Sequence, residues 1–408
     1  MLNSKNNYLC FLPPVVDDYM KKDWESLELS IILRKFATKL VIMKIRIQSY
    51  FAMRRIVMIF LFLPLLLSAK GNKDARLVII TIDGLRWQEV FTGAEESLLS
   101  DEEQVRDNEL TRQTYWRSTP EERREVLMPF TWNTIAKKGL IIGNRAKNSK
   151  MEVANKTCIS YPGYSEMMTG MVDDAIMGND AVDNPHRNVL EAANEDPRYK
   201  GRVMMYGSWK STRFAIRNEQ AGIPASVSYE PNIAKKQTPC LKMVDKMLAG
   251  MPRYWRAEHF DAFTYAYAIE TLLNDHPKVM WISFGDCDEW AHARKYDFYL
   301  DGAHGTDAFI RDIYEACEND RFYRGKTTYL ITCDHGRGLG NMWAHHDGNT
   351  MGSEATWLML LGKGVEARGE ITECGPYYNK QIAATIASVL GIDFTPDDGA
   401  SLSPIVDF

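Results

Sequence analysis

The chain has 408 residues, 45% of them hydrophobic, so it can bury a large core as one big or two moderate domains. A net charge of −5, with acidic and basic residues interspersed, excludes the basic surface typical of proteins that bind nucleic acid. An aromatic content of 11% and the lack of long low-complexity runs exclude a disordered chain.

The N-terminal part of the chain differs from the rest. Residues 1–52 carry no motif and no clear globular pattern, and we interpret them as a doubtful leader upstream of a true start at Met53. Residues 53–69 predict a secretory signal peptide, because two arginines precede an apolar run that ends in small residues. An uncleaved anchor is the alternative, although the run is shorter than the ~20 residues of a membrane span. We therefore expect an exported protein, periplasmic or secreted, with a mature chain at 70–408 and no stable membrane span.

After residue 75 the sequence alternates between strand-like and helix-like segments. A helix is predicted from Pro120, which stands at a first helical position and is followed by acidic residues. Helices are also predicted over 131–138 and 381–390, each of which is followed by a Gly. Apolar runs too short for helices predict strands at 76–83, 202–206, 279–284, 327–333 and 356–361. The alternation predicts an α/β fold with a mostly parallel central sheet flanked by helices on both faces.

The regular alternation weakens around residues 171–272. This stretch contains Trp209, Lys210, Arg213 and many tyrosines. Two interpretations stay open: a lid or specificity insertion beside the active site, and an ordinary set of surface loops and helices.

Polar side chains suited to metal binding follow the predicted strands or begin helices. Asp83 ends the first strand. Ser160 precedes a helix-like segment, where it is either an ordinary N-cap or a hydroxyl placed beside a bound phosphate. Asp288 and His292 follow the strand at 279–284, and a spacing of four places them on one face of a helix.

The same pattern recurs at the strand over 327–333. Asp334 and His335 follow it directly, and His345 and His346 come shortly afterwards. We expect one of this second pair to be a ligand. Because ligands of open α/β sheets bind beyond the carboxyl ends of the strands, these side chains are expected to converge at one edge of the sheet.

This ordered set resembles the alkaline phosphatase superfamily over roughly residues 76–392, and within it the phosphodiesterase/nucleotide pyrophosphatase and phosphoglycerate-mutase-like branches. The most specific parts of the resemblance are Asp-His-Gly at 334–336 and Asp-x-x-x-His at 288–292. The resemblance implies an alkaline-phosphatase-like fold that holds two divalent metal ions. The ligands implied for one ion are Asp288, His292 and His346. Those implied for the second ion are Asp83, Ser160, Asp334 and His335.

The resemblance also implies that Ser160 is the nucleophile, because Ser-Tyr-Pro at 160–162 is followed by Thr-Gly at 169–170. Thr157 and Ser165 are competitors for that role. The diesterase branch commonly uses Thr at this position, so the preference between monoesters and diesters stays open.

Two further residue choices rest on the resemblance. Family members often carry a Trp three residues before the last histidine ligand, as Trp343 is here, which favours His346 over His345. They also often hold a phosphoryl oxygen with an Asn about twenty residues after the nucleophile, for which Asn179 and Asn184 are the candidates.

The function implied is that of an exported two-metal hydrolase of phosphate esters, a phosphodiesterase or phosphomonoesterase that acts on a small substrate through a phosphoseryl intermediate. Asp, His and hydroxyl ligands favour zinc, with manganese as the alternative. A phosphomutase, a phosphonate hydrolase or a non-catalytic ligand-binding protein on the same fold are the other hypotheses. Sulfatases of the superfamily carry Cys or Ser ahead of x-Pro-x-Arg, and Tyr164 in place of that Arg disfavours a sulfatase.

Overall fold

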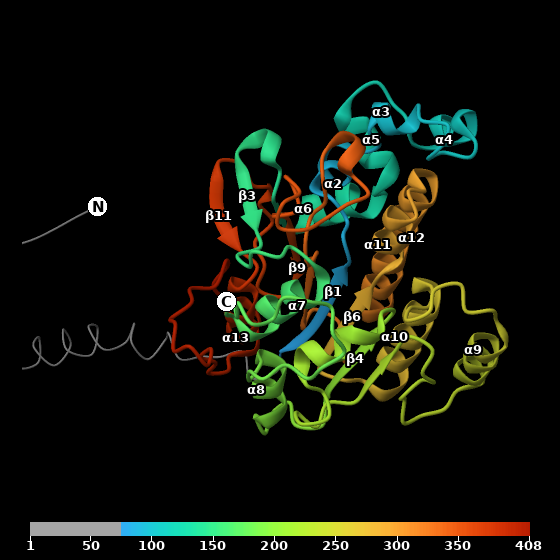
Figure 1. The fold of residues 1–408 in the computed structure, drawn as a ribbon. Helices are drawn as coiled ribbons and strands as arrows, with labels where there is room; N and C mark the ends of the chain where they lie inside the picture. Colours follow the sequence, from blue (N-terminus) through green and yellow to red (C-terminus); the bar gives the residue numbers. More distant parts are fainter. Residues whose placement is uncertain (1–74) are drawn as a thin grey trace, which may run out of the picture. The chain divides into compact units, whose positions relative to one another are not determined.

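The computed structural model describes residues 75–408, which build a large mixed sheet between two layers of helices (Figure 1). The predicted leader at 1–52 and signal peptide at 53–69 lie outside the described residues. Among the helices of the described part, none combines the length and the apolar character needed to cross a membrane.

The strand β1 (Arg76–Ile82) lies in the middle of the eight-stranded sheet and is buried along its whole length. Its neighbours β6 and β7 both run parallel to it, whereas β9 is antiparallel to both of its own neighbours. The predicted mostly parallel sheet is therefore confirmed. In spatial order the strands are β10 (Gly369–Glu370), β2 (Leu140–Ile142), β9 (Leu358–Gly362), β7 (Thr327–Thr332), β1, β6 (Val279–Phe284), β4 (Val203–Gly207) and β5 (Ala225–Val227).

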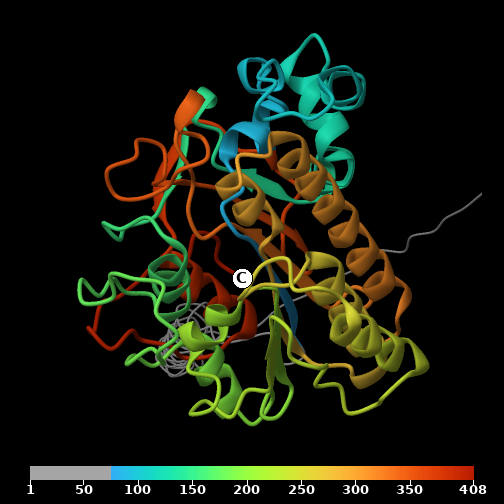
Figure 2. The same ribbon diagram turned by 45° about the vertical axis from the view of Figure 1, so that its right-hand side comes forward.

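Alternate residues of β1 enter two separate cores. Val78, Ile80 and Ile82 pack into one core, and Leu77 and Ile79 pack into the other. Figure 2 shows the long helix α12 running along the first face of the sheet. Helices of the first face are α2 (Trp87–Thr92), α3 (Glu96–Leu99), α4 (Asn108–Tyr115), α5 (Pro120–Leu127), α9 (Pro239–Gly250), α10 (Asp261–Asp275), α11 (Asp286–His292) and α12 (Tyr296–Asn319). Those of the second face are α7 (Ser160–Thr169), α8 (Val189–Glu195) and α13 (Gln381–Leu390).

Short elements complete the described part of the chain. A three-stranded sheet has the order β11 (Cys374–Tyr378), β3 (Ser149–Glu152) and β8 (Ala355–Thr356). The helical turns are η1 (Thr131–Ile135), α6 (Ala136–Lys138), η2 (Arg145–Lys147), η3 (Lys210–Ile216) and η4 (Gly340–Met342).

The strands predicted at 76–83, 202–206, 279–284 and 327–333 correspond to β1, β4, β6 and β7. The run at 356–361 instead divides at Trp357, because Thr356 pairs within the small sheet while β9 joins the large one. Within residues 171–272, β4 and β5 belong to the large sheet. A lid or specificity insertion in this range is therefore confined to the helices and loops around them, and its role stays a prediction.

Candidate active site

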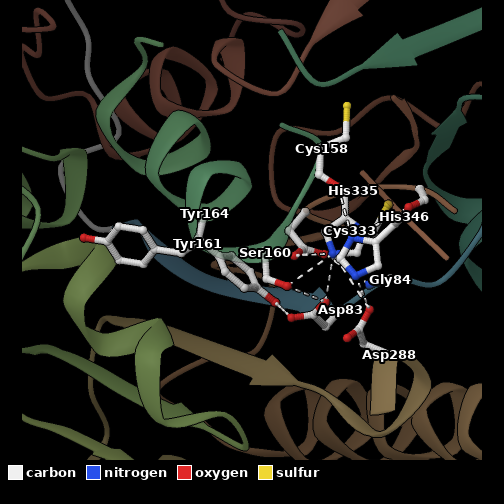
Figure 3. Close-up of polar contacts among 12 residues, drawn as sticks. Asp83, Gly84, Cys158, Ser160, Tyr161, Tyr164, Asp288, Cys333, His335 and His346 are labelled. Atoms are coloured by element: carbon white, nitrogen blue, oxygen red, sulfur yellow. Dashed lines mark hydrogen bonds and ion pairs between the residues drawn. The ribbon is translucent and has the colours of Figure 1, made fainter. Parts of the chain in front are cut away.

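Segments from four parts of the chain meet at the carboxyl edge of the large sheet (Figure 3). Asp83 follows β1, and Asp334 follows β7 with one residue between. Asp288 and His292 lie on α11, which begins two residues after β6, and Ser160 begins α7. This is the edge at which open α/β sheets bind their ligands.

Four side chains form a cluster that we call the deep group: Asp83, Ser160, Asp334 and His335. His335 Nε2 lies at its centre, 3.4 Å from Asp83 Oδ1, 3.4 Å from Asp334 Oδ2 and 3.3 Å from Ser160 Oγ. Ser160 Oγ also donates to Asp83 Oδ1 at 3.5 Å. All four are buried. The structure thus brings together the whole set predicted for the second ion.

The remaining three predicted ligands form an outer group of Asp288, His292 and His346. His292 Nε2 lies 3.0 Å from Asp288 Oδ2 and 3.0 Å from His346 Nε2. His346 Nε2 is also 3.5 Å from Asp288 Oδ1. The rings of His335 and His346 stack at 3.8 Å between centroids, so the deep and outer groups are in direct contact.

The orientation of the imidazoles fits metal binding. His335 Nδ1 donates to the carbonyl of Gly336 at 2.9 Å, and His346 Nδ1 donates to that of Cys158 at 3.0 Å. A carbonyl can only accept, so in the neutral ring each Nε2 carries its lone pair toward the centre of the cluster. This second hydrogen bond is the one that metal-binding histidines usually make.

The carboxylates fit as well. Asp334 Oδ1 accepts from the Gly84 amide at 3.1 Å, but Asp334 Oδ2 is buried and has no hydrogen-bond partner among the described residues. A buried oxygen without a partner is costly unless a ligand satisfies it. Two triplets, Asp83–Asp334–His335 and Asp288–His335–His346, have ligand atoms close enough together to hold an ion. His335 belongs to both triplets, and His292 lies beside the second one. The residues present therefore suit divalent cations at this cluster.

Charges in the cluster also favour cations. Burial, and after it the nearby Asp288 carboxylate, raises the pKa of Asp83 to about 7. Burial followed by repulsion from Asp83 and Asp288 raises the pKa of Asp334 well above its usual range. Burial lowers the pKa of His335 to about 4 and that of His346 to about 3, so both rings are neutral at pH 7. Neutral imidazoles beside carboxylates that repel one another form a set that positive ions stabilise.

Asp288 behaves differently from the other two carboxylates. Burial by itself would raise its pKa, but Arg337, His292 and His346 hold the pKa of Asp288 well below its usual range. The same carboxylate raises the pKa of His292. Asp288 is therefore ionised and surrounded by positive charge and imidazole.

The loop that precedes Ser160 is held by a buried carboxylate. Glu166 accepts hydrogen bonds from the backbone amides of Ala154, Asn155 and Lys380, and from the side chain of Asn155. The loop is thereby fixed to α7, with Ser160 as the first residue of that helix. The positive end of the helix dipole lies at this hydroxyl, which favours an anion there.

The structure separates the competing hydroxyls and histidines. Thr157 Oγ1 donates to Asn155 Oδ1, and Ser165 Oγ accepts from Asn184 Nδ2 at 2.7 Å. Of the three candidate hydroxyls, Ser160 is therefore the one that lies beside Asp83 and His335. His345 is exposed, whereas the ring of His346 lies inside the outer group.

The two candidate asparagines occupy different places. Asn179 Oδ1 accepts from the backbone amide of Tyr161, next to Ser160, at 2.9 Å. Asn184 is buried and its amide binds Ser165, one turn further along α7. Geometry favours Asn179 as the residue near a phosphoryl group, and the role of each stays a prediction.

Tyr164 and Arg337 were missed by the sequence reasoning as residues that support the site. Tyr164 OH donates to Asp83 Oδ2 at 3.0 Å, and Arg337 Nη1 donates to Asp288 Oδ1. Figure 3 shows Tyr164 reaching toward Asp83, while Tyr161 extends away from the cluster. The spacing of four between Ser160 and Tyr164 indicates that both side chains lie on the same face of a helix, and this could have pointed to Tyr164.

No protein-family model and no curated protein sequence matches the chain. Solved structures do match. A predicted sulfatase from Bacteroides thetaiotaomicron has a TM-score of 0.54 at 13% identity, over 81% of this chain and 73% of its own. A 2-O GAG sulfatase has a TM-score of 0.51 at 12% identity, over 81% and 73%. Alkaline phosphatase PafA has a TM-score of 0.52 at 9% identity, over 81% and 98%. The chain has the alkaline phosphatase fold.

The predicted resemblance to the alkaline phosphatase superfamily is thus confirmed in the fold. At identities of 9–13% the likeness fixes the architecture and leaves the reaction to the site. In this alkaline-phosphatase-like chain, the seven predicted ligand positions all lie in one cluster at the carboxyl edge of the sheet.

Proposed function

We propose that the protein is an exported hydrolase of small phosphate esters that uses two divalent ions and Ser160 as the nucleophile. The observation that carries this proposal is the position of Ser160 Oγ, at the first residue of α7 and within 3.5 Å of both Asp83 and His335. Export rests on the sequence at 53–69. Zinc is the proposed metal, with manganese as the alternative.

The ligands proposed for the deep ion are the four deep-group residues, and the ligands proposed for the outer ion are the three outer-group residues. When bound, the ions would supply the positive charge that favours an ionised serine oxygen and neutralises the phosphoryl group. Two acceptors lie near the Ser160 hydroxyl, Asp83 Oδ1 at 3.5 Å and His335 Nε2 at 3.3 Å, and its proton leaves toward them. The serine oxygen then attacks phosphorus as the bond to the leaving oxygen breaks. The leaving alkoxide takes a proton from solvent water, and a phosphoseryl group is left on Ser160.

The exposure of the two groups suits the second half of this reaction. Ser160 is buried, which keeps bulk water from the nucleophile before the substrate arrives. The side chain of His292 is 48% exposed, so the outer group meets solvent at this residue. We place the departure of the alcohol and the entry of the water that cleaves the phosphoseryl group on this outer side.

A sulfate ester hydrolase is the second candidate, because two of the similar structures are sulfatases or predicted sulfatases. The side chain at the position of the sulfatase arginine argues against it. Tyr164 stands there, and its hydroxyl binds Asp83 rather than pointing freely at a substrate. Phosphate esters therefore remain the preferred substrate class.

The deciding experiment measures turnover of an aryl phosphate monoester, a diester and an aryl sulfate, each with and without chelator. We expect metal-dependent turnover of one or both phosphate esters, and a loss of about 10³-fold or more in kcat for Ser160→Ala. Ser165→Ala is the matched control, because its hydroxyl lies on the same helix and binds Asn184. Full activity in Ser160→Ala would disprove the mechanism, and turnover of the sulfate alone would select the second candidate.

A further inference from the structure

Arg337 lies two residues after His335, and its side chain is completely buried. Its Nε donates to the carbonyl of Trp343 at 3.0 Å, and its Nη2 donates to that of Ala344 at 2.6 Å. Its Nη1 donates to Asp288 Oδ1. Because a guanidinium holds its donors in one rigid plane, these three contacts fix two other segments against the loop that follows β7.

Both segments carry outer-group ligands. Asp288 is itself a proposed ligand, and the two carbonyls belong to residues three and two positions before His346. The turn after β1 packs against the same pair: a Cβ on Gly84 would lie 2.8 Å from Arg337 Nη1 and 2.6 Å from Asp288 Oδ1. Arg337 thus lies between the outer group and the turn that follows β1.

The burial of Arg337 rules out direct contact with a substrate in this arrangement. A buried guanidinium needs a charged partner, and Asp288 supplies it. Arg337 in turn orients Asp288. Its guanidinium donates to Oδ1, while Oδ2 lies beside His292. Without Arg337, Asp288 would lose the donor that sets its orientation, and the loop before His346 would lose two anchors.

We propose that Arg337 is a positioning residue that holds the outer-group ligands in place for one of the two ions. This inference rests on the proposed two-metal site. It assigns to Arg337 a function at the outer group alone. Partners that orient metal ligands in this way typically contribute a factor of about 10–100 to metal affinity.

The test is zinc affinity, measured on the full chain by competition with a chromogenic chelator. We expect two zinc ions per wild-type chain. In Arg337→Met, one ion should bind about 10–100-fold more weakly while the other is unchanged. Arg337→Lys should lie between the two, because an ammonium keeps the charge but cannot hold both carbonyls and the carboxylate in one plane.

The matched control is Arg124→Met, which removes a buried arginine that contacts Trp132 and Glu370 instead of a ligand. This variant should keep both zinc affinities even where its unfolding temperature falls. A double-mutant cycle then tests the route of action: in an Asp288→Ala background, Arg337→Met should weaken zinc binding by a smaller factor than in the wild type, because only the anchoring of the loop before His346 is then lost.

Three results would overturn the inference. The first is an Arg337→Met protein with unchanged zinc affinities. The second is an equal loss of affinity for both ions that Arg124→Met reproduces. Absence of zinc from the wild type would overturn the two-metal proposal as well, which distinguishes the two failures. Should Arg337→Met not fold by circular dichroism, the single-ion loss expected for Arg337→Lys decides.

Discussion

The deep and outer groups differ in how far water reaches their ligands. Asp334 and His335 in the deep group are 0% exposed, and Ser160 is 4% exposed. In the outer group, the side chain of His292 is 48% exposed, whereas those of Asp288 and His346 are 14% and 4% exposed, so water reaches this group through His292. Three of the four deep-group residues follow β1 and β7, two strands whose pairing extends over six residue pairs, whereas two of the outer-group residues lie on a seven-residue helix.

This difference indicates a division of labour between the two groups. A dry, rigid deep group suits the nucleophile, because electrostatic interactions are stronger where water is excluded. An outer group that is open on one side suits exchange of alcohol, water and metal. We therefore expect a chelator to remove the outer ion first, and the predictions that follow test this comparison from the largest effect to the smallest.

The largest effect is expected for Asp334→Ala in the deep group. The substitution removes the acceptor of the Gly84 amide and the buried Oδ2, which has no hydrogen-bond partner among the described residues. We expect kcat/KM to fall by about 10³-fold, which corresponds to several kcal/mol of lost charge stabilisation, and extra zinc should not restore it. Steady-state kinetics and zinc content measure this. Asp312→Ala, at a surface residue paired with Arg311, is the control.

A smaller and reversible effect is expected for His292→Ala in the outer group. The zinc affinity of one ion should fall by more than the factor of about 10–100 expected when a partner that orients a ligand is lost, because His292 is itself a proposed ligand. Activity should still recover as zinc is added, because the exposed side of His292 lets the ion exchange. Zinc titration of activity is the measurement. His345→Ala is the control, since its exposed ring lies outside the group. Equal behaviour of His292→Ala and Asp334→Ala would remove the distinction between the two groups.

Tyr164→Phe should have a milder effect in the deep group. The change keeps the ring that packs against Trp281 and removes only the hydroxyl that donates to Asp83 Oδ2. We expect kcat to fall by about ten-fold with two zinc ions still bound, because Asp83 stays a ligand but loses its orientation. Tyr161→Phe is the matched control, since that hydroxyl donates to the carbonyl of Val182. A Tyr164→Phe enzyme with wild-type kcat would contradict this role.

Much of the fold could be predicted because its central strands are continuous apolar runs. β1, β6 and β7 are buried at every residue, and that burial appears directly in the sequence. β10 consists of Gly369–Glu370 and β5 of three residues, which are too short to show any periodicity. Their pairing depends on the rest of the sheet, so it became visible only in the structure.

That the candidate ligands converge could be predicted for a related reason, since each of the three carboxylates follows closely after a strand of the large sheet. Supporting contacts were harder to predict because they join residues far apart in sequence. Tyr164 and Asp83 are 81 positions apart, and Arg337 and Asp288 are 49 apart. Asn184 has a spacing that suits a phosphoryl ligand and an amide that donates to Ser165 Oγ, and its role stays a prediction.

The last effect expected concerns the stability of the metal-free protein, and how that stability depends on pH. The pKa of Asp83 is raised from 3.8 to about 7 by burial and then by Asp288. Between these values the folded chain keeps a proton that the unfolded chain has released, so stability falls as pH rises from about 4 to about 7. Asp83→Asn removes this group, and the variant should gain more than about 1 kcal/mol relative to wild type across that range.

Urea unfolding with chelator present, at pH 4.5 and pH 7.5, measures this difference. Asp312→Asn is the control, because its exposed carboxylate should leave the difference between the two pH values unchanged. Zinc should reverse the sign for Asp83→Asn, since a bound ion favours the ionised carboxylate and the wild type then becomes the more stable protein. A difference between wild type and Asp83→Asn that is the same at both pH values would show that the deep group is less buried, or less crowded with carboxylates, than its geometry indicates.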